Sequence, residues 1–426
     1  MKTFQPILLL CLASRLLAAD GGTLTLREAL ALATSRSPEL AAFSYDQRVA
    51  DARLLQAGLK PNPVVLLEGE DFLGGGDYSG LQQSQTTLSL GQLLELGGKR
   101  AARQQVARAG QAAVQYDYEA KRREVLRKTT EAFVEALGAQ RRVALAEETA
   151  KLAVEFVPLI QKRATAGAAS SIEQARGDVT LATSRIAVEQ ARHDLSAARR
   201  TLAAQWAAKE LGFATVAGDL DRRPAKMSFT TAYTRLEQHP LVIRWDAERE
   251  VRSAIVAREK ASAKPDVTVS GGARWLQNGG SGEPAVVAGV SIPLPFSNRN
   301  QGNIAEAQAL VEKVDEEKRA ALAALGSQLG EAWESLAKSH KQIDLLERLV
   351  LPATDKAIDA ATKGYQAGRL SQLEVLDTRR TLTDARIQAL EARIAAHKAA
   401  AILDALTAPS PDFSNKTIKE PTKTRK

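Results

Sequence analysis

Residues 363–394 read KGYQAGRLSQLEVLDTRRTLTDARIQALEARI, and an earlier segment matches this stretch at a fixed offset of 201 residues, without a gap. The matched positions pair Ala166 with Ala367, Gly167 with Gly368, Ser170 with Ser371, Glu173 with Glu374, Thr180 with Thr381, Leu181 with Leu382, Arg185 with Arg386 and Ile186 with Ile387. An offset near half the chain length indicates one structural unit used twice.

Each copy has an Ala-Gly turn, then a serine, with long helical sequence on both sides. This pattern predicts the tip of a helical hairpin at about residues 164–171 and again at about 365–371. The first structural repeat is expected to cover residues 20–211 and the second residues 230–407. Residues 212–229, with two glycines and a proline, are expected to link the two repeats.

Both ends of the chain differ from the rest. Residues 1–19 combine a basic start, an apolar run and small residues before Asp20, which is typical of a secretory signal peptide; lipidation of Cys11 is the less favoured alternative. Residues 408–426 predict a disordered basic tail. These ends carry much of the formal net charge of +8, so a basic surface for nucleic acid is not indicated. After residue 20 no stretch is apolar enough for a membrane-spanning helix.

Each repeat begins with two short helices. In the first repeat, helical spacing starts near Thr25, Ser37-Pro38 separates two helices, and the second helix runs to about Leu59. In the second repeat, a helix over residues 231–238 precedes the break at His239-Pro240, and the next helix runs to about Ala263. The similarity of the two repeats thus extends well beyond their tips.

A β-hairpin follows in each repeat, at about residues 63–94 and 265–294. Apolar and polar residues alternate along its strands, and each strand has roughly 10 residues, the length that crosses a bilayer in a tilted barrel strand. Four strands do not close a barrel, and an open sheet edge in lipid leaves unpaired N–H and C=O groups. Several subunits would therefore pool their strands: two chains would supply eight and three would supply twelve.

The helices after each hairpin are unusually long. Residues 300–367 would form on the order of 100 Å of helix at about 1.5 Å per residue. Within them one set of residues follows the 3,4 alternation of a coiled-coil seam: Leu322, Leu325, Leu329, Ala332, Leu336, Ser339, Ile343, Leu346 and Val350. Pro158 and Pro352 predict kinks, or points where helix gives way to irregular chain.

No motif indicates an enzyme, a cofactor or a resident metal ion. The glycine-rich loop at residues 74–76 is interpreted as a surface loop. Residues 91–100 superficially match a phosphate-binding loop, but Arg100 stands where that motif needs a hydroxyl. The four histidines have no ligand-like spacing. Neither a catalytic residue nor a cofactor-binding residue is predicted.

Four phrases carry a resemblance to a known family: Lys60-Pro-Asn-Pro63, Glu68-Gly-Glu-Asp-Phe72, Leu94-Glu-Leu-Gly-Gly-Lys-Arg100, and the stretch from Gly364-Tyr-Gln-Ala-Gly368 to Glu374-Val-Leu-Asp377. Together with the duplicated order of helices, β-hairpin and helical hairpin, they resemble the TolC superfamily of outer-membrane efflux channels. Within it they resemble the CzcC-type heavy-metal subgroup. The similarity covers about residues 23–406.

The resemblance implies a mainly α-helical fold with a membrane β-barrel: a long coiled-coil helical barrel, plus four strands per protomer in a trimeric 12-stranded barrel. It implies an outer-membrane location in a Gram-negative bacterium, with the helical tunnel in the periplasm. The implied partners are two further copies, a periplasmic adaptor (membrane fusion protein) and a proton-driven inner-membrane pump of the RND type. The implied function is a passive exit duct, with divalent cations of the cobalt, zinc and cadmium type as cargo.

For the periplasmic constriction, the resemblance implies a gating tyrosine at Tyr365 and an acidic pair at Glu374 and Asp377. Glu173 is a further candidate acid. The first tip departs from the family because Thr165 stands where the family has an acidic gate partner.

Glu374 and Asp377 lie three residues apart on one helix face, where like charges repel, so a function for the pair is indicated. At the equivalent positions of the first repeat, Glu173 and Arg176 are expected to form an ion pair. The alternative is that Arg380 neutralises Asp377 on a solvated helix.

The tips are expected to contact the adaptor, because their turns present small and apolar residues: Ala166, Gly167 and Ala168 at the first tip, and Ala367, Gly368, Arg369 and Leu370 at the second. Two ordinary tight turns are the alternative.

Two other functions remain open at this point. One is a TolC-like duct for drugs or other small molecules. The other is a periplasmic coiled-coil structural or adaptor protein in which the β-segments form a small soluble domain; the duplicated hairpins, placed between helices in each half, argue against it.

Overall fold

The computed structural model describes residues 22–167, 169–278 and 281–409. The expected signal peptide, Ala168 and the expected tail from residue 410 lie outside this range. Two compact units make up the described chain. Unit 1 contains residues 22–41, 121–236 and 325–409, and unit 2 contains residues 42–120 and 237–324.

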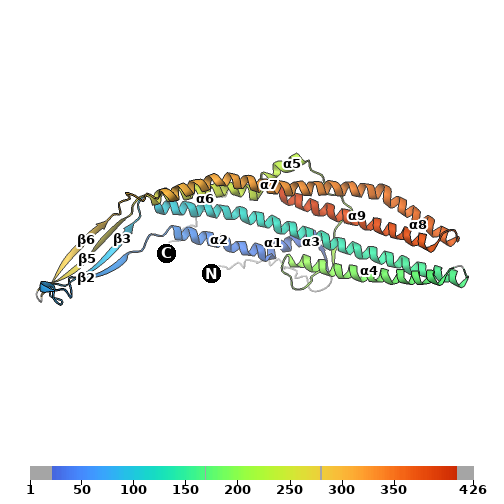
Figure 1. Ribbon diagram of the computed structural model, residues 1–426, viewed down its shortest axis with the longest axis horizontal. Coiled ribbons are helices and arrows are strands. Elements are labelled where there is room, and N and C mark those ends of the chain that lie inside the picture. The colour runs from blue at the N-terminus through green and yellow to red at the C-terminus, as the bar shows by residue number, and fades with distance from the viewer. Residues whose placement is uncertain (1–21, 168, 279–280, 410–426) are drawn as a thin grey trace, which may run out of the picture. The chain divides into compact units, whose positions relative to one another are not determined.

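Helices form most of the described chain (Figure 1). Those of the first repeat are α1 (Leu26–Arg36), α2 (Pro38–Ala57), α3 (Lys99–Thr165) and α4 (Ser171–Ala204). Those of the second are α5 (Phe229–Leu236), α6 (Pro240–Ser262), α7 (Gln301–Leu345), α8 (Leu351–Gln366) and α9 (Gln372–Thr407). A five-residue π-helix, Leu346–Val350, joins α7 to α8 and is called the π segment below.

Local sequence explains where the short helices begin. The Thr25 side chain accepts a hydrogen bond from the Glu28 N–H, and the Glu28 carboxylate accepts one from the Thr25 N–H, so a capping box starts α1. α6 starts at Pro240, and the ring of His239 before it accepts a hydrogen bond from the Leu241 N–H at 3.2 Å. These helix starts and the predicted breaks at Ser37-Pro38 and His239-Pro240 are confirmed.

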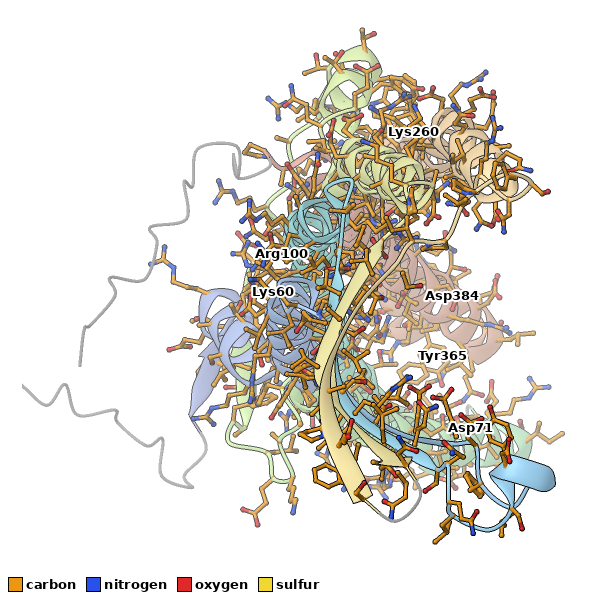
Figure 2. The ribbon with its side chains drawn as sticks, turned by 90° about the vertical axis from the view of Figure 1, so that its left-hand side faces the viewer. Lys60, Asp71, Arg100, Lys260, Tyr365 and Asp384 are labelled. Atoms are coloured by element: carbon orange, nitrogen blue, oxygen red, sulfur yellow. The ribbon has the colours of Figure 1, made fainter. Side chains whose placement is uncertain are left out.

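Unit 2 contains an antiparallel sheet with the strand order β2-β3-β5-β6. Its strands are β2 (Val64–Glu70), β3 (Gln85–Leu94), β5 (Val267–Asn278) and β6 (Ser281–Ser291). A short 3₁₀ turn, η1 (Gly76–Tyr78), lies in the β2–β3 connection, and Asp71 begins that connection at the far end of the strands (Figure 2).

The register of the four strands gives the sheet one apolar face. Apolar residues opposite one another include Leu67 with Leu88, Leu88 with Ala273, Ala273 with Val286, and Val269 with Val290. On the other face, Arg274 donates to the Thr87 hydroxyl and the Gln85 side-chain oxygen, both at 2.9 Å. The alternation seen in single strands therefore becomes one apolar and one polar surface of a whole sheet.

A second, two-stranded sheet was not predicted. β1 (Thr23–Thr25) pairs in parallel with β4 (Thr215–Ala217), which lies within the expected linker. The Gln140 side chain on α3 fixes β4, because it accepts from the Val216 N–H at 2.7 Å and donates to the Val216 carbonyl at 3.1 Å. Three-residue strands are too short for an alternation to reveal them in the sequence.

The core of unit 1 confirms the predicted seam on α7. Its buried members run from Leu325 to Leu346 and include Leu329 and Ile343. Val350 departs from the seam because it is 37% exposed. A separate cluster packs β1 and β4 against α3, α4 and α9 and contains Leu24, Phe133, Leu137, Leu202, Trp206, Phe213, Val216 and Ile394.

A half-buried ion-pair cluster joins α3 to α9 within unit 1. The Glu135 carboxylate forms ion pairs with Arg142 at 2.6 Å and with Lys398 at 2.5 Å. Burial by itself would raise the pKa of Glu135, but the hydrogen bonds from Lys398 and Arg142 outweigh that effect and lower it. Glu135 is therefore a paired, ionised side chain at neutral pH.

The two prolines behave differently. α3 continues as an α-helix through Pro158, so irregular chain at that position, one of the two predicted outcomes, is wrong. Pro352 lies in the first turn of α8, directly after the π segment. The interruption of regular helix predicted near this proline therefore falls on the five residues before α8.

Candidate functional site at the helical tips

Both tips in unit 1 have the same backbone design. Gly167 has a φ of +72° and Gly368 a φ of +73°, the left-handed conformation that ends a helix and that glycine adopts without strain. At the second tip the N–H groups of Arg369 and Leu370 both donate to the Gly364 carbonyl, at 2.8 and 3.2 Å. The Ala-Gly pair found by the repeat therefore marks the helix end in each copy.

The tip residues differ in their exposure. Ala166, Gly167, Ala367, Gly368 and Arg369 are exposed. Leu370 is half-buried, since it packs against the apolar cluster of the tip and covers Gly364. Leu370 is therefore less exposed than the turn residues before it, and Ala168 lies outside the described residues.

Two exposed aliphatic residues beside the tips were missed. Ile172 is 62% exposed at the start of α4, and Leu373 is 59% exposed at the start of α9. These two positions are related by the same 201-residue offset as the rest of the repeat. The offset alone pointed to them, because both copies keep a large aliphatic residue two places after the serine.

Glu173 and Glu374 both complete capping boxes. The Glu173 carboxylate accepts from the Ser170 N–H at 2.9 Å, and the Glu374 carboxylate accepts from the Ser371 N–H at 2.7 Å. The hydrogen bond from the Ser371 N–H, and to a smaller extent the one from the Ser371 hydroxyl, lower the pKa of Glu374. A Ser-x-x-Glu pattern predicts this arrangement, so each glutamate has a structural role at the start of its helix.

The charges that were expected to balance these acids lie elsewhere. Among the described residues Glu173 forms no ion pair with Arg176, so that expected pair is wrong. Arg380 lies 3.9 Å from Asp384, and among the described residues it forms no ion pair with Asp377. Asp377 is exposed on the first turns of α9. Of the acidic pair, Glu374 is used in capping and Asp377 is open to solvent.

Tyr365 lies inside the tip. It is 1% exposed and packs with Phe156, Ile160, Ala361 and Val375. Its ring lies 5.3 Å from that of Phe156. In the described part of the chain the Tyr365 hydroxyl has no hydrogen-bond partner.

Arg163 on α3 contacts Tyr365 in two ways. Its guanidinium lies 4.4 Å from the centre of the Tyr365 ring and donates to the Tyr365 carbonyl at 2.6 Å. Burial raises the pKa of Tyr365, Arg163 partly offsets this effect, and Glu173 adds to it. The neutral phenol is therefore the stable form, and the ring holds α8 against α3.

Three polar residues that join the two hairpins were missed: Arg163, Gln372 and Arg379. The Gln372 side chain donates to the Glu173 carbonyl at 2.8 Å. Arg379 lies over the Phe156 ring at 4.4 Å and donates to the Leu152 carbonyl at 2.8 Å. Burial lowers the pKa of Arg379.

A signal for these residues exists in the repeat itself. At the 201-residue offset, Arg163 corresponds to Gly364 and Arg379 to Asp178. Each arginine thus has a residue of another kind in the other copy. For these two arginines, the differences between the two copies mark contacts between the hairpins.

The structure brings together Tyr365, Glu173 and the start of α9, whereas Asp377 and the turn residues Ala166, Gly167, Ala367, Gly368 and Arg369 are exposed. Among the residues that the structure describes, no group of three or more histidine, cysteine or acidic side chains is arranged to hold a metal ion.

No helix within residues 22–409 of the described chain combines the length and the apolar character needed to cross a membrane.

Comparisons with known proteins agree with this architecture. The model of the family described as "Outer membrane efflux protein" matches residues 29–208 and 232–408. The cobalt-zinc-cadmium resistance protein CzcC of Cupriavidus metallidurans is 32% identical over 386 residues, which cover 90% of each chain. The nickel-cobalt-cadmium resistance protein NccC of Alcaligenes xylosoxydans xylosoxydans is 28% identical over 66% of this chain and 64% of its own.

Solved structures show the same fold. CusC superposes with a TM-score of 0.74 at 17% identity, over 90% of this chain and 92% of its own. This similarity confirms the expected TolC-like fold class. The matched family, described as "Outer membrane efflux protein", consists of channel components and not of enzymes. From the two matched segments, which together span both repeats, and from the identity to CzcC along nearly the whole length, we conclude that the chain belongs to the outer membrane efflux protein family.

Proposed function

We propose that this outer membrane efflux protein is the exit duct for divalent heavy-metal cations in a three-part, proton-driven efflux system. One observation carries the choice of cargo: the chain is 32% identical, over 90% of both chains, to a protein named for cobalt, zinc and cadmium resistance. NccC, named for nickel, cobalt and cadmium resistance, supports the same class of cargo.

The sheet of unit 2 supports a trimer with pooled strands. Its outer strands in the described chain are β2 and β6, and each has one edge without a partner strand. The large side chains of its apolar face are exposed, among them Leu67, Val269, Trp275 and Val286. Three copies would pair β6 of one chain with β2 of the next, close a 12-stranded barrel, and place the apolar faces in lipid.

The acids of the second tip support a cation-attracting constriction in the periplasmic part of the duct. Asp377 is open to solvent and Glu374 is ionised at neutral pH, because its pKa is lowered by the hydrogen bonds from Ser371. Three copies around one axis would bring both carboxylates of each chain together, which raises the local cation concentration and repels anions. Glu173 would add to this charge, and Tyr365 would act from inside the tip by holding α8 in place.

The exposed turns support docking of the tips to a periplasmic adaptor, which would connect the duct to an inner-membrane pump of the RND type. Ala166, Gly167, Ala367 and Gly368 expose backbone and small side chains, and Arg369 adds a charge. Ile172 and Leu373 add exposed aliphatic area beside the turns. Ala168 and Leu370 remain with the docking proposal, Leu370 as a support beneath the turn.

The experiment that tests this function uses the purified chain in planar lipid bilayers. The wild type should conduct, prefer cations over anions, and be blocked by Co²⁺ or Zn²⁺ from the periplasmic side. Glu374→Gln with Asp377→Asn should weaken both the preference and the block. Glutamine can keep the capping box, so the helix start should survive the loss of charge.

Asp359→Asn with Asp384→Asn is the matched control, since it also removes two exposed carboxylates, one from α8 and one from α9. It should leave selectivity and block unchanged. Unaltered selectivity and block in the first double variant would remove Glu374 and Asp377 from the conduction path.

Cargo is tested separately in cells. Deleting the gene should sensitise the host to cobalt, zinc or cadmium salts, and the wild-type gene should restore growth. A conducting protein whose deletion leaves metal tolerance unchanged would refute the cargo and not the channel.

A further inference from the structure

The π segment interrupts the second long helical stretch of unit 1. α7 ends at Leu345, the π segment covers Leu346–Val350, and α8 begins at Leu351. Pro352, in the first turn of α8, has no N–H to donate to the preceding turn. Two interruptions of the helical hydrogen-bond pattern therefore occur within one short stretch.

The interruption also changes which side of the helix is buried. Leu336, Ile343 and Leu346 continue the buried seam of α7, but Leu349 is 63% exposed and Val350 is 37% exposed. The wider turn of a π-helix accommodates an extra residue and so shifts the seam. Side-chain packing that holds α7 in place therefore ends at Leu346.

The corresponding helix of the first repeat has no such interruption. α3 runs as one α-helix over Lys99–Thr165, through Pro158. Of the two described helical stretches that lead to the tips, the one before the second tip contains the π segment, although both repeats have the same order of elements. A proline alone is thus not the cause of the π segment.

The linker residue Arg223 forms ion pairs on both sides of the junction between α7 and the π segment. Arg223 pairs with Asp344 in the last turn of α7 at 2.6 Å and with Glu347 in the π segment at 2.7 Å. Arg393 on α9 pairs with the other oxygen of Glu347 at 2.9 Å and with Asp221 of the linker at 3.2 Å. The ion pairs thus form one chain, and two of its members, Arg223 and Asp221, belong to the linker; its order is Asp344, Arg223, Glu347, Arg393 and Asp221.

The linker is fixed before and after these two residues. The Leu220 carbonyl lies 3.3 Å from the His397 ring on α9, and the Met227 carbonyl accepts from the Trp333 indole N–H on α7 at 3.0 Å. The Asp219 carboxylate accepts from the Asp221 N–H at 2.9 Å. Arg223 is therefore presented from an anchored segment, which lowers the entropy lost when its ion pairs form.

We propose that the π segment is a hinge for α8, and that Arg223 and Asp221 of the linker restrain it. α8 carries Tyr365 at its far end, so rotation about the hinge displaces the second tip relative to α3. Breaking the ion pairs of Arg223 frees the π segment from the last turn of α7. The segment that joins the two repeats thereby controls the motion of the second tip.

Hydrogen exchange followed by mass spectrometry of the full chain in detergent tests the hinge. Arg223→Gln removes both ion pairs that cross the start of the π segment. Losing two half-exposed ion pairs corresponds to exchange roughly three- to tenfold faster in α8. Exchange in α9 and in the part of α7 before Leu336 should stay within error of the wild type.

Arg192→Gln is the matched control. Arg192 also pairs with two carboxylates, Glu147 at 2.8 Å and Glu189 at 2.9 Å, but among the described residues it contacts neither the π segment nor α8. This variant should leave exchange in α8 unchanged. Faster exchange in α8 in both variants, or spread evenly over unit 1 for Arg223→Gln, would overturn the proposal.

A second variant tests the hinge from the opposite direction. Deleting Leu349, an exposed residue of the π segment, removes the extra residue and should restore a continuous α-helix. Exchange in α8 should then become slower than in the wild type, even with Arg223→Gln present. Unchanged or faster exchange would rule out the π segment as the hinge. Exchange reports the motion itself, so its outcome does not depend on channel activity.

Discussion

Replacing Tyr365 with phenylalanine or with alanine separates the contribution of its ring to protein stability from the contribution of its hydroxyl. The ring fills the tip cluster of unit 1, lies 5.3 Å from the Phe156 ring and is covered by Arg163 at 4.4 Å. Truncating a buried aromatic residue to alanine costs about 3–5 kcal/mol. The upper part of that range applies here, since both the aromatic and the cation–π contact are lost with the ring.

The Tyr365 hydroxyl lowers the stability of the folded protein, whereas the ring raises it. It is buried, and within the described residues it has no hydrogen-bond partner. An unpaired buried polar group costs about 1–3 kcal/mol relative to its absence. Tyr365→Phe keeps the ring contacts and removes that cost, so it should stabilise the protein by about 1 kcal/mol.

Thermal unfolding of the helical circular dichroism signal in detergent measures both effects. At roughly 1 °C per kcal/mol for a chain of this size, Tyr365→Ala should lower the Tm by about 4 °C and Tyr365→Phe should raise it by about 1 °C. Tyr45→Phe is the control, since Tyr45 is 62% exposed; its Tm should not change. A clear loss of stability in Tyr365→Phe would mean that the hydroxyl has a partner in the assembled protein, and would refute a purely packing role for the ring.

Three further predictions concern other parts of the molecule. Val269→Lys, on the apolar face of the sheet, should impair trimer assembly more than Ser270→Lys on the polar face, because a charge at the bilayer midplane costs roughly 2–4 kcal/mol; equal assembly on native gels would argue against lipid contact. A photo-crosslinker at Arg369 should capture a periplasmic adaptor in cells, whereas capture only from Glu331 would move the contact to mid-helix. The pKa of Glu135 in the folded protein is lowered from 4.5, so the stability that its ion pairs contribute is present above pH 4.5 and is lost as the pH falls through the lowered value. Glu135→Gln should therefore make the free energy of unfolding less dependent on pH in that window. An equal pH dependence in the variant and the wild type would contradict this role.

The sequence by itself determined the local structure and the duplication. Helix starts at Pro38 and Pro240 follow from residues within one turn. The seam from Leu325 to Leu346 follows from the spacing of apolar residues along one helix. The repeat, found from identities at one offset, located both tips because the Ala-Gly turns are set by backbone conformation, which is local.

The capping boxes at the two tips also follow from local sequence. Ser170 with Glu173 and Ser371 with Glu374 both fit the Ser-x-x-Glu pattern. The resemblance instead implied a constriction for Glu374 and Asp377, and like charges on one helix face indicated a function for that pair. A hydrogen bond within the first helical turn is the simpler reason for a glutamate at position 374. Asp377 takes part in no such capping and is exposed.

Only the tertiary structure decided the contacts between distant segments. The parallel pairing of β1 with β4 joins residues 192 positions apart, and neither strand is long enough to show a period. The burial of Tyr365 under Arg163 depends on how α8 packs against α3. The ion pairs of Arg223 with Asp344 and Glu347 join residues 121 and 124 positions apart. Such features arise from side chains that meet only after the chain has folded, because local patterns fix each element, whereas packing and long-range ion pairs fix how the elements meet.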